Sequence, residues 1–464
     1  MGTLSSIFSS RRLPQYLAAI IANLASIAYG VVAGWSSPSL PLLKSNDTAI
    51  GEPISVEDET WLGSVIHLSA LLSSPIYSYI NQNWGRKLAG YNTAIPLIIG
   101  WLLIIFAHSV IHLYIARILM GLTMSGVNVF VVMYVGEISE DSVRGALGSI
   151  RGLSADVGIL FAYGIGPYLS VRHMGIICII MPLLFVVLFF WLPESPMFLL
   201  GKGKAQEALN SYKWLRGGDE QIAEEEIRKL SVVVTKVSKK VTITELISVR
   251  GTRNALIIAI VFSIVIQFSG MYVIASYASI LFEQSGSTIP SDIAAIIIGV
   301  FTIIGSALSI IGSELAGRRI ILISTQIIES LSLSGLAIYL LLKEIGIDVS
   351  PVGILPVIFI SAYCLCIAAG VATLGYVVIS EIFRPEARGL AMSVTSSLVW
   401  GLAFVITKFH HSLESSIQLY GCFFVYSGVA LLGAIFTYIR VPETKNRSLD
   451  SILRELNGDA SVNG

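Results

Sequence analysis

Long apolar stretches separated by short polar segments dominate the pattern of hydrophobic and polar positions along the 464-residue chain. A helix needs about 20 mostly apolar residues to cross a bilayer, and each stretch is close to that length or longer. The pattern therefore predicts an all-α membrane protein with twelve transmembrane helices. The predicted spans are residues 14–36, 59–81, 89–108, 111–134, 146–168, 174–192, 254–282, 291–313, 320–342, 351–380, 390–409 and 416–439.

A longer polar segment separates the sixth predicted span from the seventh. Two parts of it, Ala205 to Leu215 and Ile222 to Leu230, carry apolar residues at helical spacing, so we expect short helices on the aqueous face of the membrane. The expected units are an N-terminal six-helix half at 1–192, a central cytoplasmic segment at 193–253, a C-terminal six-helix half at 254–440 and a cytoplasmic tail at 441–464.

Lysine and arginine are unevenly distributed between the two faces that these spans define. The face that carries both termini also carries 24 of the 30 Lys and Arg residues. Because positively charged loops stay in the cytoplasm, both termini are expected there. Residues 37–57 then lie outside the cell, where the sequon Asn46-Asp47-Thr48 predicts glycosylation of Asn46.

Composition excludes several other classes of protein. Hydrophobic residues make up 54% of the chain and charged residues 13%, with a mean hydropathy of +0.78, whereas a soluble domain has roughly 25% charged residues. Basic and acidic residues balance at 30 each, so no nucleic-acid partner is expected. All four cysteines lie in apolar stretches, which predicts buried thiols and neither a metal site nor a disulfide framework. We expect no cofactor and no enzyme chemistry.

Polar motifs recur in the same order in the two halves. The segment from Glu137 to Arg144 recurs as Glu381 to Arg388, with an offset of 244 residues for both ends. The other matched pairs are Gly85-Arg86-Lys87 with Gly317-Arg318-Arg319, and Pro193-Glu194-Ser195 with Pro442-Glu443-Thr444. Such repeats indicate two related six-helix halves, the architecture of carriers that bind cargo at the repeat interface and work by alternating access.

The repeated charges sit at the expected cytoplasmic helix ends and form a candidate conformational salt-bridge lock. In each repeated segment, the Glu and the Arg seven residues later would be about 10.5 Å apart along an unbroken helix. This is too far for them to pair with each other, so each is placed to pair with a residue on a neighbouring helix. A network formed in one conformation can bias an equilibrium between two. The alternative is positive-inside topology with solvated loop ends. The candidate residues are Arg86, Lys87, Glu137, Arg144, Glu194, Glu314, Arg318, Arg319, Glu381, Arg388 and Glu443.

With these motifs the sequence resembles the sugar porters of the major facilitator superfamily, from the first helix to the tail. Within that family, the segment Leu24 to Pro38 is most similar to the arthropod facilitated trehalose transporters and their relatives. Further matching motifs are Ala116 to Gly121, Tyr134 to Gly145, Pro193 to Pro196, Gln267-Phe-Ser-Gly270 and Pro442 to Ser448.

The resemblance implies a sugar site built from polar and aromatic side chains. Gln267 matches a glutamine of the family's seventh helix, and Trp400 matches a tryptophan of its eleventh. Tyr272, Thr302 and Tyr376 fall on family binding positions but differ from the usual residues, which suggests a remodelled pocket. Gly152 and Ile266 stand where the family has binding glutamines, and Gln82 and Met197 depart from the family's cytoplasmic motifs.

Two intramembrane charges and one histidine need a separate explanation. Arg117 belongs to a family motif, so we expect it to have a structural partner. Asp156 belongs to none and is either half of an interhelical structural pair or a cavity-lining group that binds substrate or a proton. His67 is expected to be a hydrogen-bonded packing residue.

These observations predict a facilitative carrier in the plasma membrane that works by alternating access and whose cargo is a small-molecule sugar, such as trehalose or a related sugar or polyol. A proton-coupled symporter is the first alternative, but the family position for the acid in the first helix is Val31. A non-transporting sugar sensor is the second alternative, although the tail after the last helix has only 24 residues. The sequence does not indicate an oligomeric state.

Overall fold

The computed structural model describes residues 12–45, 50–140, 142–236 and 243–457, and all regular structure in these ranges is helical. The N-terminal half contains α2 (Leu13–Gly34), α3 (Ser36–Lys44), α4 (Val56–Trp84), α5 (Arg86–Ile105), α6 (Val110–Ile138), α7 (Arg144–Ile165), η1 (Gly166–Tyr168), α8 (Val171–Cys178) and α9 (Ile180–Phe189). The C-terminal half contains α14 (Arg250–Phe268), α15 (Met271–Ser285), α16 (Ser291–Ala316), α17 (Arg318–Glu344), η2 (Ser350–Val352), α18 (Leu355–Ala369), α19 (Val371–Ile382) and α20 (Pro385–Arg440). Between the halves lie α10 (Pro196–Gly201), α11 (Ala205–Leu215), α12 (Glu220–Lys236) and α13 (Ile243–Ser248), and α21 (Leu449–Asn457) follows the second half.

The helices supply the twelve predicted crossings. Ten helical segments in the described ranges are long and apolar enough to cross a membrane. One of them lies within α20, whose 56 residues would extend about 84 Å as a single helix, far more than a bilayer needs. Gln418, with a φ of 61°, breaks α20 into two crossings. The 29-residue α4, which begins with three acidic residues, is the twelfth.

The acidic start of α4 is a local consequence of its sequence. Ser55 and Asp58 form a capping box, in which each side chain accepts a hydrogen bond from the backbone N–H of the other residue. Glu57, Asp58 and Glu59 also lie in the first turn, where the helix dipole favours negative charge. These charges lower the hydropathy of the span but stabilise its beginning.

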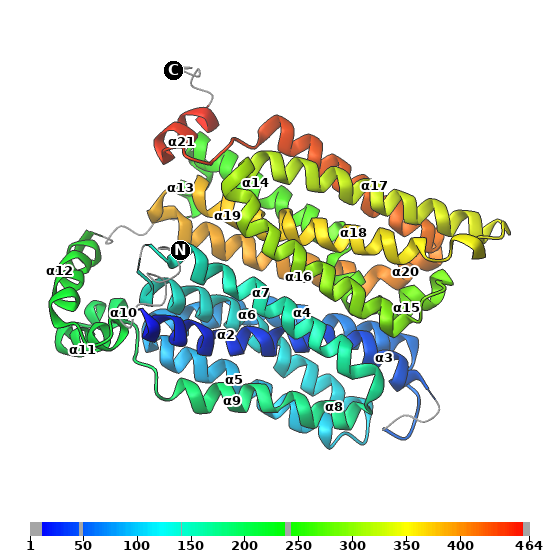
Figure 1. Ribbon diagram of the computed structural model, residues 1–464, viewed down its shortest axis with the longest axis horizontal. Coiled ribbons are helices and arrows are strands. Elements are labelled where there is room, and N and C mark those ends of the chain that lie inside the picture. The colour runs from blue at the N-terminus through cyan, green and yellow to red at the C-terminus, as the bar shows by residue number, and fades with distance from the viewer. Residues whose placement is uncertain (1–11, 46–49, 141, 237–242, 458–464) are drawn as a thin grey trace, which may run out of the picture.

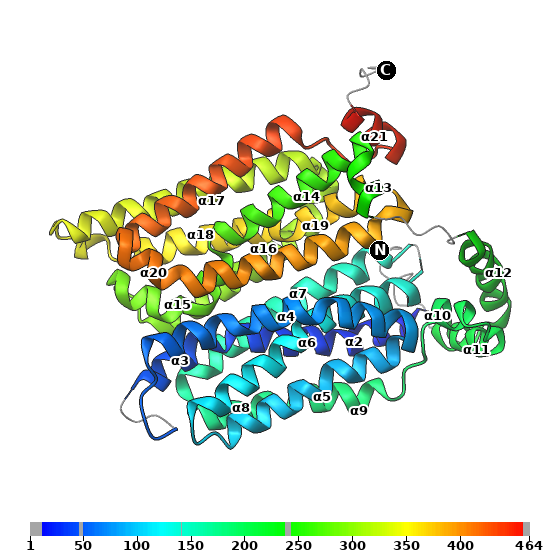
Figure 2. The same cartoon turned by 180° about the vertical axis from the view of Figure 1, so that it is seen from behind.

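The two halves form two helical bundles side by side (Figures 1 and 2). Helices α10 to α13 and α21 gather at one end of the molecule, and we call this end the terminal face. Helix α11 has the bounds predicted from the sequence, and α12 includes the second predicted helix. Arg216, at the end of α11, donates to the Ile138 carbonyl oxygen at 3.1 Å and pairs with Glu226 at 2.7 Å, which ties this region to the N-terminal half.

Arg117 holds the N-terminal bundle together, as the sequence predicted. Its fully buried guanidinium donates to the carbonyl oxygens of Val32 at 3.0 Å and Leu62 at 2.9 Å, and to Ser36 Oγ at 2.7 Å. It also lies 5.0 Å from the Trp35 ring centroid. The cation thus joins α2, α3 and α4 and satisfies backbone groups at the α2–α3 junction, a structural role that offsets the cost of burying its charge.

Candidate functional site

Helix breaks lie at the interface between the halves. The apolar segment Arg250–Ser285 is interrupted between Phe268 and Met271, where Gly270 has a φ of 92°. Segment Ser350–Ile382 is interrupted at Gly370. Interrupted membrane helices expose backbone polar groups and are tolerated where they line a binding cavity, so these breaks mark the middle of the interface as the candidate site.

Gln267 lies one turn before the first break and is fully buried. Neither its Oε1 nor its Nε2 has a hydrogen-bond partner within the described part of the chain. A buried amide without partners costs free energy, and such a group can both donate to and accept from adjacent sugar hydroxyls. The side chain therefore has the chemistry of a ligand-binding group.

Aromatic rings from both halves pack together in the same region. The ring centroids of His67 and Tyr272 are 4.6 Å apart, and Trp400 lies 5.9 Å from His67 and 6.1 Å from Tyr272. The Tyr272 hydroxyl is also 3.4 Å from that of Tyr29. The expectation that His67 is hydrogen-bonded is wrong, because neither ring nitrogen has a partner among the described residues. His67 instead joins α4 to α15 and α20 through ring packing.

Thr302 and Tyr376, the other two predicted cargo residues, lie in α16 and α19 and are partly buried. Thr302 Oγ1 donates to the Ile298 carbonyl oxygen of its own helix at 2.8 Å, which leaves the hydroxyl oxygen able to accept another bond. The described hydrogen bonds and ring contacts connect Tyr272 with Trp400, but they do not connect Thr302 or Tyr376 with that pair. Tyr376 nevertheless lies within electrostatic reach of Tyr272 and Tyr29.

Asp156 contacts the opposite half in this region. It accepts a hydrogen bond from Ser306 Oγ at 2.5 Å, and this bond joins α7 to α16. Arg151 does not pair with Asp156 but donates to Asn128 Oδ1 at 2.5 Å. No Lys, Arg or His in the described ranges forms an ion pair with Asp156. The partner found is thus a hydroxyl group across the interface.

At the terminal face, the predicted lock residues of the N-terminal half form a compact cluster. Arg86 pairs with both carboxylate oxygens of Glu137, at 2.6 and 2.8 Å, and Ser195 Oγ donates to Glu137 at 2.5 Å. Glu194 accepts from the backbone N–H groups of Arg86, Lys87 and Ser195. Burial raises the pKa of Glu194, and these donors together with the Arg86 charge only partly oppose it. The cluster joins α5, α6 and the start of α10.

The C-terminal half repeats this arrangement. Arg318 pairs with Glu381 at 3.3 Å. Glu443 accepts from four backbone N–H groups, those of Arg318, Arg319, Thr444 and Lys445, at 2.9 to 3.1 Å. Burial opposes ionisation of Glu443, but these four donors outweigh it and hold its pKa below the ordinary value. The sequence repeat is therefore also a repeat of contacts.

A glycine with positive φ makes room for each acidic side chain. Gly85 and Gly317 have φ values of 101° and 92°. A Cβ atom would lie 2.5 Å from Glu194 Oε2 in the first case and 2.6 Å from Glu443 Oε2 in the second. Both the backbone conformation and the close carboxylate explain why each basic motif begins with glycine.

Other predicted lock residues bind backbone carbonyl groups of their own half. Arg144 donates to the carbonyl oxygens of Gly136 and Ser139 within its own half. Arg319 donates to the Tyr438 carbonyl oxygen, and Arg388 is exposed. The side chain of Glu314 lies outside the described residues, as does Asn46.

Side-chain contacts join the halves at the end opposite the terminal face. Ser37 Oγ is 3.0 Å from Ser279 Oγ, and the Tyr163 hydroxyl donates to the Ala275 carbonyl oxygen at 2.7 Å. Lys408 and Phe404 of α20 both contact Trp61 of α4. Closer to the terminal face, an apolar groove of about 770 Å³ runs between Leu71 of α4 and the Leu390 to Val405 stretch of α20, which otherwise pack against each other. The interface is thus closed by side-chain contacts at one end, the closed end, and grooved toward the other, the parted end.

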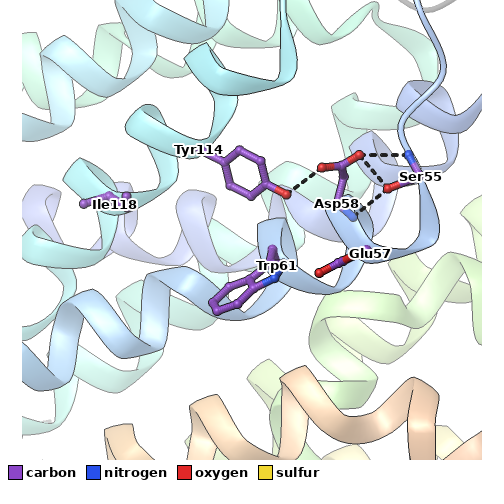
Figure 3. Close-up of a pocket in the computed structure, with 6 residues that line it drawn as sticks. All are labelled: Ser55, Glu57, Asp58, Trp61, Tyr114 and Ile118. Carbon is purple, nitrogen blue, oxygen red and sulfur yellow. Dashed lines mark hydrogen bonds between the residues drawn. The ribbon is translucent and has the colours of Figure 1, made fainter.

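A second cavity, of about 360 Å³, lies at the closed end on the N-terminal half (Figure 3). In it Asp58 accepts hydrogen bonds from Tyr114 at 2.7 Å and from Ser55 Oγ at 2.6 Å. Glu57, Trp61 and Ile118 complete its lining. Since the carboxylate of Asp58 is already satisfied by its neighbours, this cavity is a weaker candidate for a binding site than the central interface.

Comparison with known proteins agrees with this architecture. The family described as "Sugar (and other) transporter" matches residues 18–456. The facilitated trehalose transporter Tret1 of Apis mellifera ligustica is 30% identical over 446 residues, which cover 96% of this chain and 88% of that protein. Tret1 of Bombyx mori is 30% identical over 444 residues, covering 95% and 86%.

Solved structures show the same fold. The partially occluded inward-open form of the xylose transporter XylE from E. coli superposes with a TM-score of 0.76 at 18% identity, over 92% of this chain and 100% of that one. The proton:xylose symporter XylE bound to 6-bromo-6-deoxy-D-glucose gives 0.75 at 20% identity, over 96% and 99%. The chain therefore belongs to the "Sugar (and other) transporter" family and has the fold of the major facilitator superfamily, and it is a multi-pass membrane sugar carrier that works by alternating access.

Proposed function

We propose that this protein is a facilitative carrier of trehalose or a related sugar or polyol in the plasma membrane. The central observation is the unpartnered amide of the buried Gln267, which lies five residues before Tyr272 of the aromatic cluster that joins the halves. An amide can bind sugar hydroxyls, and an aromatic ring can cover the apolar face of a sugar. The proposed cargo residues are Gln267, Trp400, Tyr272, Thr302 and Tyr376.

The proposed orientation places the terminal face in the cytoplasm. It is supported by the 24 Lys and Arg residues on that side of the predicted topology. With this orientation, the closed end faces outward and the parted end faces the cytoplasm, so the described conformation is inward-facing. Glycosidase mapping tests the orientation, since a glycan is expected at Asn46 and not at Asn446. A glycan at Asn446 alone would invert it.

We propose that the charge clusters at the terminal face control which conformation is populated. Support comes from their repetition in both halves and from the absence of a described bond between Arg388 and the opposite half in this inward-facing form. In the outward-facing form the terminal ends of the halves would approach each other. Arg144 and Arg388 are then placed to reach acidic partners across the interface.

Uniport is favoured over proton coupling by the apolar residue at the family's coupling position in the first helix. Val31 is buried and cannot carry a proton. The second candidate function, proton-coupled symport, is favoured by one observation, the bond from Ser306 to Asp156 that links the halves. Protonation of Asp156 would alter that bond.

Uptake of labelled sugars into proteoliposomes tests the proposal. We expect trehalose or a related sugar to equilibrate without accumulation, at a rate unaffected by a proton gradient. Gln267→Ala should weaken transport, whereas Gln284→Ala, an exposed glutamine near the outer end of α15, should not. Gradient-driven accumulation that Asp156→Asn abolishes would establish symport instead. Sugar binding without any transport would indicate a sensor.

A further inference from the structure

Glu329 is a buried carboxyl group that the transport site does not use. It lies near the middle of the 27-residue α17, about 16 Å along the helix from Arg318 at its start. Its side chain is 0% exposed. Neither Oε1 nor Oε2 has a hydrogen-bond partner within the described part of the chain. An isolated Glu belongs to no motif, so the sequence did not single it out.

The surroundings of Glu329 offer no positive charge. On α18, the titratable groups within electrostatic reach are the Tyr363 hydroxyl and the Cys366 thiol. On the second part of α20, the interface with α17 presents Tyr426, near Tyr363, and the hydroxyl groups of Ser427 and Thr437. Among the described residues, no Lys, Arg or His forms an ion pair with Glu329.

The other helices that pack on α17 bring no cation to this layer. The described charged side chains of α16 and α19 lie at helix ends, as Asp292 and Glu381 do. Glu381 pairs with Arg318 at the terminal face. A carboxylate ion at Glu329 would therefore be an uncompensated charge at mid-membrane, whereas a neutral carboxylic acid carries no such penalty.

Unpartnered polar atoms gather in the same layer. The Tyr363 hydroxyl and Gln326 Nε2 both lack partners among the described residues, and Gln326 lies three residues before Glu329 on the same helix. Gln326 Oε1 is held by Thr437 Oγ1 at 3.0 Å, which fixes the amide between α17 and α20. A protonated carboxyl group can donate one hydrogen bond and accept others, so it suits this mixture of donors and acceptors better than an ion does.

We propose that Glu329 is an intramembrane proton-binding site, occupied in the folded carrier and enclosed within the C-terminal half. The helices that surround it, α17, α18 and the second part of α20, all belong to that half. Alternating access moves one half against the other and leaves such an interior intact. The proton stays bound through the transport cycle, so it stabilises the bundle and does not couple sugar movement to a proton gradient.

Infrared difference spectroscopy of the reconstituted protein tests for the bound proton. Wild type at neutral pH should show a carboxylic C=O band that shifts in D2O and is lost in Glu329→Gln. Asp156→Asn separates any contribution from the other buried acid, and Glu344→Gln, an exposed glutamate on the same helix, should leave the band unchanged. Loss of ionised-carboxylate bands instead, with the C=O band intact, would overturn the proposal.

The pH dependence of stability provides a second, independent readout. Glu329 holds a proton in the folded protein and releases it in the unfolded chain. Its contribution to the stability of the fold therefore falls as the pH rises. One such group changes the equilibrium constant of folding by at most tenfold per pH unit. Glu329→Gln should remove this contribution to the slope of stability against pH between pH 5 and 8, roughly the range of maximal protein stability. The variant should exchange sugar at the wild-type rate. If the Glu329→Gln variant does not fold, the infrared band is measured in the Asp156→Asn variant, where Asp156 cannot contribute to it. A D2O-sensitive C=O band in that variant supports the proposal, and its absence overturns it. Identical slopes in well-folded wild type and Glu329→Gln would contradict the proposal.

Discussion

Lys408 Nζ lies 4.2 Å from the ring centroid of Trp61 and donates to Thr60 Oγ1 at 2.9 Å, although 348 residues separate Lys408 from Thr60. The contact joins α20 of the C-terminal half to α4 of the N-terminal half at the closed end. A cation over an indole ring contributes about 0.5 to 2 kcal/mol, depending on its exposure to water. Because this contact can exist only while that end is closed, it stabilises the described conformation, which is inward-facing in the proposed orientation.

Lys408→Met should therefore shift the population toward the outward-facing form. Losing about 0.5 to 2 kcal/mol changes the ratio of the two forms by roughly 2- to 30-fold. Distances between spin labels on the outer ends of α4 and α20 would report the shift. Lys343→Met is the matched control, because Lys343 binds the Gln284 carbonyl oxygen within its own half. An unchanged distance distribution in Lys408→Met would show that the contact does not bias the equilibrium.

For the cargo site, Gln267→Ala should weaken sugar binding by about 1 to 3 kcal/mol, the cost of leaving buried polar groups unsatisfied. Trp400→Ala should also impair binding, whereas Trp191→Ala, an exposed tryptophan at the end of α9, should not. Binding isotherms on purified protein measure both effects. Wild-type affinity for sugar in both cargo-site variants would show that the binding site lies elsewhere in the protein.

Gly85→Ala and Gly317→Ala should each destabilise the carrier. With ψ values of 166° and 159°, both glycines adopt an extended backbone at positive φ that is essentially restricted to glycine, so alanine would cost about 1 to 3 kcal/mol there, and its Cβ would also press on Glu194 or Glu443. Gly145→Ala is the control, because Gly145 is in α7 and nothing lies within 4 Å of its added Cβ. Thermal unfolding monitored by size-exclusion chromatography gives the comparison. Equal melting temperatures for all three variants would contradict the assigned role of the motif glycines.

Glu194 and Glu443 should have opposite effects on the pH dependence of stability. The pKa of Glu443 is lowered in the folded state, so its contribution is present above the ordinary value of 4.5 and is lost as the pH falls. The pKa of Glu194 is raised, so its contribution is present below 4.5 and is lost as the pH rises through the folded value. Melting curves of Glu443→Gln and Glu194→Gln against pH should deviate from wild type in opposite directions. If the melting temperatures of both variants deviated from wild type in the same direction with pH, the opposite roles assigned to Glu194 and Glu443 would be refuted.

Arg388→Ala should slow transport while leaving outward-facing sugar binding comparatively intact, because Arg388 is far from the cargo site and acts on the balance of conformations. Exchange rates and binding of a non-transported ligand measured side by side separate the two effects. Arg384→Ala, which removes an exposed charge four residues earlier, is the control. Loss of ligand binding in folded Arg388→Ala protein would count against a conformational role.

The sequence by itself determined the class of protein and much of its organisation. Twelve apolar stretches predict twelve crossings because a bilayer sets the length of a helix. The repeated glycine, basic and acidic motifs also predict which helix ends lie together, and Arg86 with Glu137 and Arg318 with Glu381 are paired in the structure. Local chemistry and periodicity suffice for such features.

Tertiary structure decided which buried polar groups have partners. Asp156 and Arg151 are close in sequence, yet Asp156 binds Ser306 of the other half and Arg151 binds Asn128. The isolation of Glu329, the ring packing of His67 on Tyr272 and the contact between Lys408 and Trp61 likewise depend on helices far apart in sequence. Hydrogen bonds and ring contacts act over a few ångströms, so only the packing of the helices brings such groups together or leaves them apart.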